Sequence, residues 1–318
     1  MKVLITGYTG FLGRHLARRL KENGYIVRVL MHRRTLTHID FSNEADEIIW
    51  GSIDSPDVIK QAVKGVQTVV HSAWTFSSPS SERPTINEIG TELLFKECIK
   101  EDVKSFVFIS SVAVYGMISK EKSVVKESSP LVTGKELSFI YPSEKIKVEE
   151  FLRSYDKKMT KLGIFRPCPI FSDKNIPIRK IVRIAGFSFA IGLGNGKNRL
   201  PFIHAEDVAD AVVMWLKNDN NDVVLNITPT ACMRVKDWYR SVGKVHGLKV
   251  HPIFIRIVFI RLGYFGLTTL KKILGKQSKG NINYAIQCAT RDIGYSNEAL
   301  KETLDWTDKE TSKYWRQE

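Results

Sequence analysis

Short apolar runs alternate with longer segments of helical periodicity along the first half of the chain. In one such segment, Leu12, Leu16 and Leu20 recur every four residues and share one helix face. Apolar runs indicate strands at 3–6, 26–31, 67–71, 105–110 and 162–166. Helical spacing indicates helices at 11–20, 56–64, 86–100 and 140–159. This alternation predicts an α/β fold in which helices cover both faces of a parallel sheet.

The rhythm changes after Arg166-Pro167. A loop rich in glycine and asparagine follows at 192–198, and a helix and a strand then return to the sheet, at 206–217 and 223–227. The chain is therefore expected to form a doubly wound body and a smaller mixed α/β lobe. The body is assigned to residues 1–173 and 206–227, and the lobe to residues 174–205 and 228–318.

Three glycines stand between the first strand and the first helix. One allows a tight turn, one lets the backbone approach a pyrophosphate, and one lets the helix pack closely on the strand. The helix N-terminus then faces the anion. The loop residues expected to contact such a ligand are Gly7, Thr9, Gly10, Phe11, Leu12 and Gly13. The spacing G-x-x-G-x-x-G thus predicts that the body is a Rossmann-type dinucleotide-binding domain.

The end of the second strand bears on which dinucleotide is bound. An NAD site usually places an acidic residue there, on the ribose hydroxyls. This chain has His32-Arg33-Arg34 at that point, with no acidic residue before Asp40. Arg33, and Arg14 directly after the glycine loop, could pair with a 2′-phosphate. The sequence therefore favours NADP, with NAD as the alternative.

A tyrosine and a lysine on one expected helix suggest acid–base chemistry. Tyr141 and Lys145 are four residues apart and so lie on the same helix face. An ammonium close to a phenol lowers the phenol pKa, which makes Tyr141 a usable general acid or base. Ser110-Ser111 ends an apolar strand, at the ligand-binding edge of such a sheet, where a hydroxyl can hold a substrate oxygen.

The ordered set of these motifs resembles the extended short-chain dehydrogenase/reductases, in the NAD(P)-dependent epimerase/dehydratase group, over about residues 1–310. The matching pieces are residues 6–13, 71–73, 87–91, 110–116, 141–145, 166–167 and 202–209. The resemblance implies Ser111, Tyr141 and Lys145 as the catalytic set, with Lys145 also binding the nicotinamide ribose. It further implies cofactor contacts from Ile53, Ala73, Asn87 and Tyr141, and Asn87 also resembles the helix asparagine that supports the site.

Departures from the family pattern limit which reactions the protein is expected to catalyse. Val112-Ala113 stands where sugar-nucleotide 4,6-dehydratases carry Asp-Glu, so elimination of water lacks its acid and base. Segments 194–199 and 290–293 look more like the hydroxysteroid-dehydrogenase-like branch than like the sugar epimerases. The sequence therefore favours an NADP-preferring oxidoreductase acting on a secondary alcohol or ketone.

Two other functions stay open. One is a nucleotide-sugar epimerase with tightly held NAD, in which Arg199 and Arg291 would bind the substrate diphosphate. The other is a non-catalytic protein that uses the fold only to sense a dinucleotide.

Charge is concentrated in the expected lobe. The 318 residues include 48 Lys and Arg against 34 Asp and Glu, a net charge of +14. Segments 174–205 and 228–290 carry +6 and +10, and the remainder carries −2. This pattern argues against nucleic acid and favours a small anionic or lipid-like substrate, or a membrane surface beside the site. Arg256 and Arg261 do not share one helix face, so segment 253–274 is expected to be a buried helix of the lobe rather than a membrane contact.

Further expectations concern metals, location and assembly. The four cysteines (Cys98, Cys168, Cys232 and Cys288) lack metal-site or disulfide spacing, so neither feature is expected. The N-terminus reads as a strand rather than a signal peptide, and no uncharged run is long enough to span a membrane, which favours a cytoplasmic protein. Helices 86–100 and 143–159 resemble the pair through which family members often form homodimers.

Overall fold

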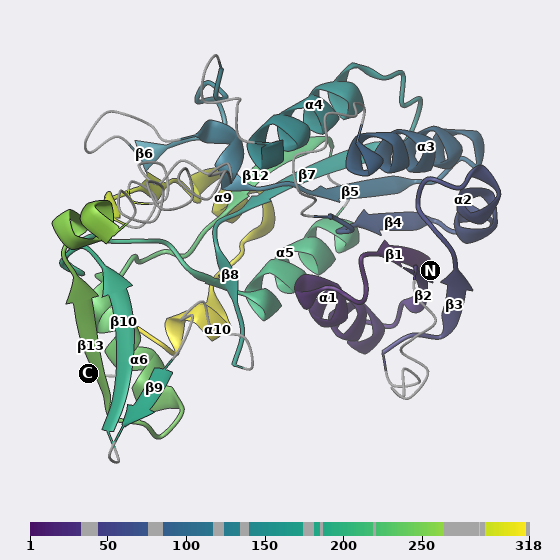
Figure 1. The fold of residues 1–318 in the computed structure, drawn as a ribbon. Coiled ribbons are helices and arrows are strands. Elements are labelled where there is room, and N and C mark those ends of the chain that lie inside the picture. The colour runs from purple at the N-terminus through teal and green to yellow at the C-terminus, as the bar shows by residue number, and fades with distance from the viewer. Residues whose placement is uncertain are drawn as a thin grey trace, which may run out of the picture.

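The computed structural model gives the arrangement of most of the chain. It describes residues 1–32, 44–75, 85–116, 124–133, 140–173, 181–184, 187–218, 221–263, 286 and 290–315. Figure 1 shows a large body built around one sheet and a smaller lobe at its side.

Seven parallel strands form the central sheet, in the order β12-β7-β5-β4-β1-β2-β3. Their bounds are β1 Lys2–Thr6, β2 Ile26–Met31, β3 Glu47–Trp50, β4 Thr68–His71, β5 Ser105–Ile109, β7 Lys161–Pro167 and β12 Val223–Ile227. The chain builds β1 to β3 in one direction and then crosses back to build β4 to β12 in the other. The reversal lies between β1 and β4, and such switch points hold ligands at the carboxyl ends of the strands. The doubly wound α/β prediction is confirmed.

Helices cover both faces of this sheet. On one face lie α1 (Phe11–Glu22) and α5 (Ala205–Lys217), and on the other lie α2 (Pro56–Val63), α3 (Ile86–Lys100) and α4 (Ile140–Ser154). Side chains alternate along a strand, so Val3 and Ile5 of β1 pack in the first layer and Leu4 packs in the second. Two apolar layers therefore hold the sheet edge where the ligand site is expected.

Two elements of the body differ from the sequence prediction. Strand β3 was not predicted, because its four residues are half-buried at the sheet edge and its apolar run, Ile48 to Trp50, is too short to show a period. Helix α4 ends at Ser154 rather than at residue 159. Lys158 adopts a left-handed φ of 49°, and a turn is closed by the Thr160 amide donating to the Lys157 carbonyl.

The lobe is built on a three-stranded sheet of β9 (Ile181–Ile184), β10 (Phe187–Leu193) and β13 (Val250–Ile255). Helix α6 (Val235–Val245) packs against β13. The prediction that 253–274 is a buried helix is wrong for its described part, 253–263. These residues finish β13 and form a helical segment at 257–263 whose side chains are largely exposed, and among the described elements α6 packs on the opposite face of β13.

Short elements connect the lobe to the body. Two small pairs, β8 (Ile170–Phe171) with β11 (Ile203–His204) and β6 (Val124–Val125) with β14 (Gly294–Tyr295), lie between them. Helices α9 (Glu298–Leu304) and α10 (Lys309–Ser312) return to α5. Leu300, Leu304 and Trp306 are buried in the body's core, so this stretch of the expected lobe packs on the body.

Candidate active site

Two cavities meet at the switch point of the sheet. Each has a volume of about 500 Å³, and both are lined by Gly7, Gly10, Ser72 and Trp74. The β2-side cavity extends toward the ends of β2 and β3, and the β5-side cavity extends toward β5, α4 and the lobe. Together they form a groove across the carboxyl ends of the strands, the place where a dinucleotide lies in doubly wound sheets.

The glycine loop has the geometry expected of a pyrophosphate cradle. Gly7 has a φ of +78°, and a Cβ on Gly13 would lie 2.2 Å from the Gly7 carbonyl oxygen. The Gly10 amide donates to that same oxygen at 2.9 Å. Helix α1 has Gly10 as its N-cap with no side-chain cap, and no acidic residue in its first turn. Its first N–H groups are therefore free to donate hydrogen bonds to an anion. The geometry of the loop thus fits the pyrophosphate of a dinucleotide.

The loop residues predicted to contact the cofactor line the two cavities. Thr9 lines the β2-side cavity together with Ile53 and Ala73, and Phe11, Leu12 and Gly13 line the β5-side cavity. Ile53 is fixed by Gly90 of α3, on which a Cβ would lie 2.6 Å from the Ile53 side chain. The two ends of the groove are therefore built from the residues expected to bind the cofactor.

Arg14 and Arg33 were the two arginines predicted to pair with a 2′-phosphate, and Arg14 lies away from the β2-side cavity. Arg14 lines neither cavity, and its guanidinium binds both carboxylate oxygens of Glu44 at 2.9 Å. Tyr8 donates to the same carboxylate at 2.7 Å. The Arg14 guanidinium is therefore directed at Glu44 rather than into the β2-side cavity, and its contact with a 2′-phosphate stays a prediction. Arg33 lies outside the described residues, and its neighbour His32 lines the β2-side cavity.

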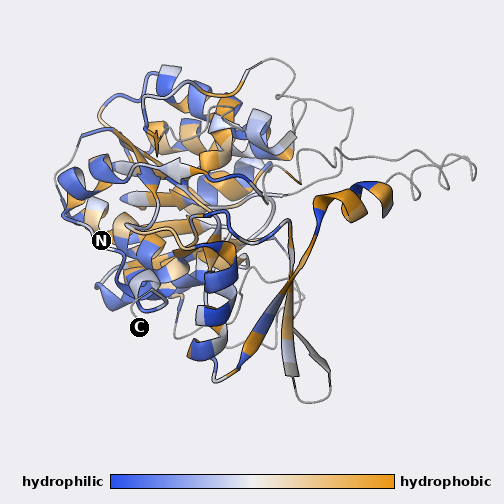
Figure 2. Ribbon diagram, turned by 90° about the vertical axis from the view of Figure 1, so that its left-hand side faces the viewer, coloured by the Kyte–Doolittle hydropathy of each residue, from blue (hydrophilic) through white to orange (hydrophobic). Residues whose placement is uncertain are grey.

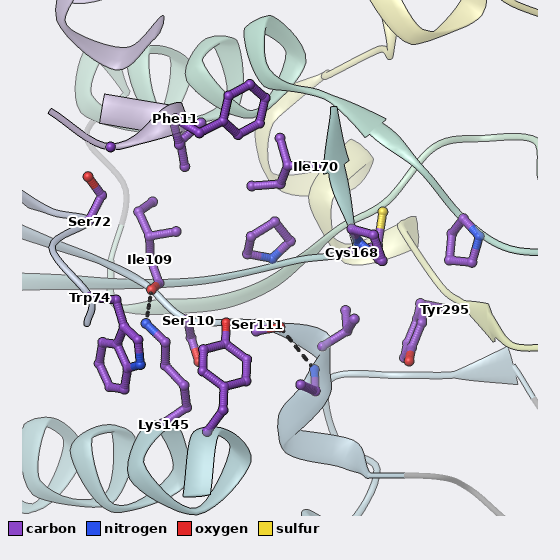
Figure 3. Close-up of a pocket in the computed structure, with 18 of the residues that line it drawn as sticks. Phe11, Ser72, Trp74, Ile109, Ser110, Ser111, Lys145, Cys168, Ile170 and Tyr295 are labelled. Carbon is purple, nitrogen blue, oxygen red and sulfur yellow. Dashed lines mark hydrogen bonds between the residues drawn. The ribbon is translucent and has the colours of Figure 1, made fainter. Parts of the chain in front are cut away.

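Lys145 is held at the floor of the β5-side cavity. Its ammonium donates to the Ile109 carbonyl at 2.7 Å and lies 3.4 Å from the centre of the Trp74 ring (Figure 3). The Phe108 ring centre is 4.6 Å away. Because the side chain is buried, the pKa of Lys145 is well below its usual value.

Tyr141 and Ser111 face each other across the same cavity. The Trp74 ring meets the Tyr141 ring edge-on with centroids 6.1 Å apart. Burial raises the pKa of Tyr141 above 10, and the nearby Ser111 hydroxyl offsets this rise only in part. The expectation that Lys145 lowers this pKa is not met, because the ammonium lies 6.0 Å from the Tyr141 ring centre and is directed at Ile109. The phenol therefore carries its proton at neutral pH.

The neighbouring serines have different environments. Ser110 is buried and donates to the Glu149 carboxylate at 2.5 Å. Ser111 caps the 3₁₀ turn η2 (Val112–Tyr115), where its hydroxyl accepts from the Ala113 amide at 3.1 Å (Figure 3). Since Ser110 is committed to Glu149, Ser111 is the serine whose hydroxyl can hold a substrate oxygen.

Asn87 supports the site without lining either cavity. Its amide donates to the Thr75 carbonyl and to the Glu144 carboxylate at 3.0 Å each, and its oxygen accepts from the Thr75 amide at 2.9 Å. It thereby ties α3 to the loop after β4 and to α4. This geometry agrees with a supporting role rather than with direct cofactor contact.

Sequence reasoning missed two residues of the site. Trp74 follows the 71–73 motif and covers Lys145, and its place just after a buried strand was the available signal. Glu149 lies one turn beyond Lys145 on α4 and forms a buried ion pair with Arg166 of β7. The spacing Tyr141, Lys145, Glu149 marks one continuous helix face, a pattern visible in the sequence.

The lobe side of the β5-side cavity is apolar. It is lined by Ile170, Leu200, Pro201, Ile293 and Tyr295, and Lys145 is the one charged residue among the described residues that line this cavity. Arg199 lies outside the lining and is exposed, with its backbone amide bonded to the Asp292 carboxylate. No metal-binding cluster of His, Cys, Asp or Glu occurs in the described part of the chain.

The sheet, the glycine cradle and the cavity beside Tyr141 and Lys145 define an NAD-dependent enzyme of the extended short-chain dehydrogenase/reductase type. The chain belongs to the NAD dependent epimerase/dehydratase family, whose profile matches residues 3–228.

Curated relatives cover most of the chain at low identity. It is 24% identical to a decarboxylating sterol-4-alpha-carboxylate 3-dehydrogenase of Dictyostelium discoideum, over 93% of this chain and 96% of that protein. It is 25% identical to a ceramide reductase of Caulobacter vibrioides, over 80% of this chain and 73% of that protein. The solved structure of MoeE5 in complex with UDP-glucuronic acid and NAD superposes with a TM-score of 0.70 at 20% identity, covering 97% of this chain and 94% of that one. At that identity the structural likeness shows the fold alone.

Proposed function

We propose that this protein is an NADP-preferring reductase of an apolar ketone, and that it catalyses the reverse oxidation of the corresponding secondary alcohol. The observation that carries the proposal is the apolar lining on the lobe side of the β5-side cavity. A nucleotide-sugar diphosphate would need cationic partners there, and neither Arg199 nor Arg291, the residues expected to supply them, is among the described residues of that lining. The similarity to sterol and ceramide enzymes agrees with a lipid-like substrate.

Three side chains of the cavity divide the chemistry. The bound dinucleotide supplies the hydride at nicotinamide C4. Ser111 donates a hydrogen bond to the substrate oxygen, and Tyr141 transfers its phenolic proton to that oxygen as the alkoxide forms. Lys145, held by the Ile109 carbonyl at 2.7 Å, would bind the nicotinamide ribose. The phenol of Tyr141, whose pKa burial raises further above 10, would supply the proton needed for reduction at neutral pH.

The preference for NADP rests on the β2-side cavity. Its described lining includes His32 and Ser52 but no carboxylate, so a 2′-phosphate meets no like charge there. Asn87, Ile53 and Ala73 serve the same half of the groove, the first by holding the loop after β4. Arg33 is proposed to add the cation that pairs with the phosphate.

We also propose a homodimer in a reducing, cytoplasmic setting. Helices α3 and α4 pack side by side on one face of the sheet, as required of a shared dimer face. The cysteines Cys98, Cys168 and Cys232 are all free thiols. Burial raises the pKa of the Cys98 and Cys168 thiols, which suits an inert structural role.

The experiment follows a deuterium label from the cofactor. The full-length protein is incubated with NADPH or NADH carrying deuterium at C4 and with 3-keto sterols, long-chain ketones, UDP-glucose or UDP-galactose. The proposal expects label at the carbinol carbon of an apolar product, faster from NADPH than from NADH. Interconversion of the UDP-sugars without label from added cofactor would instead identify an epimerase. Cofactor binding without turnover of any substrate would support a sensor.

A further inference from the structure

The outer face of the lobe sheet carries exposed apolar side chains. Strands β10 and β13 pair in parallel with Ile191 opposite Ile253, and these two side chains are 50% and 49% exposed. On the opposite face, Phe254 of β13 stacks on Tyr239 of α6 at 6.0 Å between ring centres. The sheet therefore buries one face against α6 and presents isoleucines, including Ile255, to solvent on the other.

The exposed apolar surface continues into residues 257–263. Phe259 and Leu262 are 61% and 62% exposed, and Val258 also faces solvent. Figure 2 shows this segment as an orange helical turn that stands away from the body. We call the set of Ile191, Ile253, Ile255, Val258, Phe259 and Leu262 the apolar face. Clusters of this kind on a soluble chain mark interaction surfaces.

Basic residues accompany the apolar face. Arg256 and Arg261 are exposed on the same short segment as Phe259. Residues 228–263 contain seven basic residues and one acidic residue. A second copy of this lobe would bring like charges together, whereas an anionic bilayer surface attracts them. Arginines can also keep their heads among phosphates while their stems lie along apolar groups.

The apolar face lies next to the rim of the β5-side cavity. The Gly194 amide donates to the Ile255 carbonyl at 2.9 Å, at the end of β13. A Cβ on Gly194 would lie 2.9 Å from the Thr290 side chain, and Ile293, three residues further, lines the cavity. A bilayer in contact with the apolar face would therefore lie beside the apolar end of the cavity.

We propose that the apolar face docks this protein on an anionic bilayer, with Phe259 and Leu262 in the acyl boundary and Arg256 and Arg261 among the headgroups. Among the described residues, no helix is long and apolar enough to cross a bilayer. The proposed contact is interfacial and combines apolar burial with electrostatic attraction. Docking goes beyond the proposed reaction and does not depend on it.

The test is co-sedimentation of the full chain with phosphatidylcholine vesicles, with and without phosphatidylglycerol. Binding is expected only with phosphatidylglycerol, and salt should weaken it. The variants Phe259→Glu/Leu262→Glu and Arg256→Glu/Arg261→Glu should each lower the partition coefficient by at least about tenfold. Met159→Glu is the matched control, since Met159 is 91% exposed on the body, outside the apolar face, and this variant should bind like the wild type.

Cofactor titration of every variant separates docking from folding and from catalysis. Variants that bind NADPH normally but lose vesicle binding support the proposal, whether or not the label experiment finds a reductase. Failure of the wild type to bind anionic vesicles, or unchanged binding of Phe259→Glu/Leu262→Glu, overturns it. A change from dimer to monomer by that variant without lipid would also overturn it, because the apolar face would then be a contact between copies.

Discussion

Trp74 gives the active-site lysine an environment that motif spacing does not reveal. The lysine ammonium sits 3.4 Å from the indole ring centre and bonds to the Ile109 carbonyl, so its charge is directed away from Tyr141. Burial is then the largest influence on the Tyr141 pKa, which is raised rather than lowered. The same motif can thus hold a tyrosine whose phenol is protonated and available as a proton donor.

His71 links the two apolar layers beneath this site. It is fully buried, and its ring nitrogens bond to Thr6 at 2.6 Å and to Thr91 at 2.8 Å. Burial, with the nearby charge of Lys145, lowers the pKa of His71 from 6.5 to about 3. Its imidazole therefore stays neutral in the folded protein at pH values where the unfolded chain binds a proton.

This difference predicts a pH-dependent loss of stability. The stabilisation is fully present above the unfolded pKa of about 6.5 and is lost as the pH falls toward 3. Between about pH 7 and pH 5, the free energy of unfolding should fall by about 2 kcal/mol more in the wild type than in His71→Asn. Urea unfolding at the two pH values measures this. Equal pH slopes in the two proteins would contradict a neutral, buried His71.

Helix α4 carries Tyr141 and Lys145 on one face, and Glu149, on the next turn, holds the helix to β7. Glu149 and Arg166 are almost completely buried and bond to each other, and Arg166 also donates to the Tyr115 hydroxyl at 2.7 Å. The Ser110 hydroxyl completes this network. The ion pair therefore fixes the rotation of α4 relative to β5 and β7, and so the positions of Tyr141 and Lys145.

Breaking this pair should be costly. Glu149→Gln leaves the Arg166 charge buried without a carboxylate, and we expect a loss of about 3–5 kcal/mol in unfolding free energy. The exposed pair Lys96–Glu92 of α3 is the control, and Lys96→Met should cost at most about 0.5 kcal/mol. Replacing both Glu149 and Arg166 by apolar residues should cost less than Glu149→Gln. A Glu149→Gln variant as stable as Lys96→Met would contradict the anchoring role.

The sequence predicted the body of the molecule better than the lobe. Buried strands such as β1 and β5, and the glycine loop, carry strong local signals, and their order identifies the switch point. Strand β3 was missed because an edge strand of four half-buried residues has no clear periodicity. Segment 253–263 was misjudged because its apolar residues suggest burial, and only the three-dimensional arrangement shows that α6 covers the opposite face of the sheet.

Within the site, the residues that line the cavity could be predicted from the sequence, but their ion pairs and pKa shifts could not. Ser111, Tyr141 and Lys145 line one cavity as expected. The pairing of Arg14 with Glu44 joins residues from α1 and from beyond β2, so no local pattern could reveal it. The burial that sets the pKa of Tyr141 likewise arises from tertiary packing.

At the scale of the whole molecule, charge and apolar exposure coincide. The net charge of +14 is concentrated in the lobe segments, and the apolar face lies on the same lobe. The body around the cofactor groove is close to neutral by sequence, so its ligand is held by local geometry rather than by the overall field. We therefore propose that the body binds the cofactor and carries the catalytic residues, and that the substrate enters beside the lobe.

The most direct test of the proposed catalysis compares Tyr141→Phe with Tyr155→Phe. Tyr155 packs against Phe95 and Phe151 just beyond the end of α4, so its change controls for the loss of one hydroxyl on the same side of the sheet. For each protein, the dissociation constant for NADPH and the rate of deuteride transfer to the apolar ketone are measured. The account predicts that Tyr141→Phe binds NADPH like the wild type and transfers deuteride about 10²–10⁴-fold more slowly, with Tyr155→Phe unchanged. Deuteride transfer by Tyr141→Phe at the wild-type rate would contradict it.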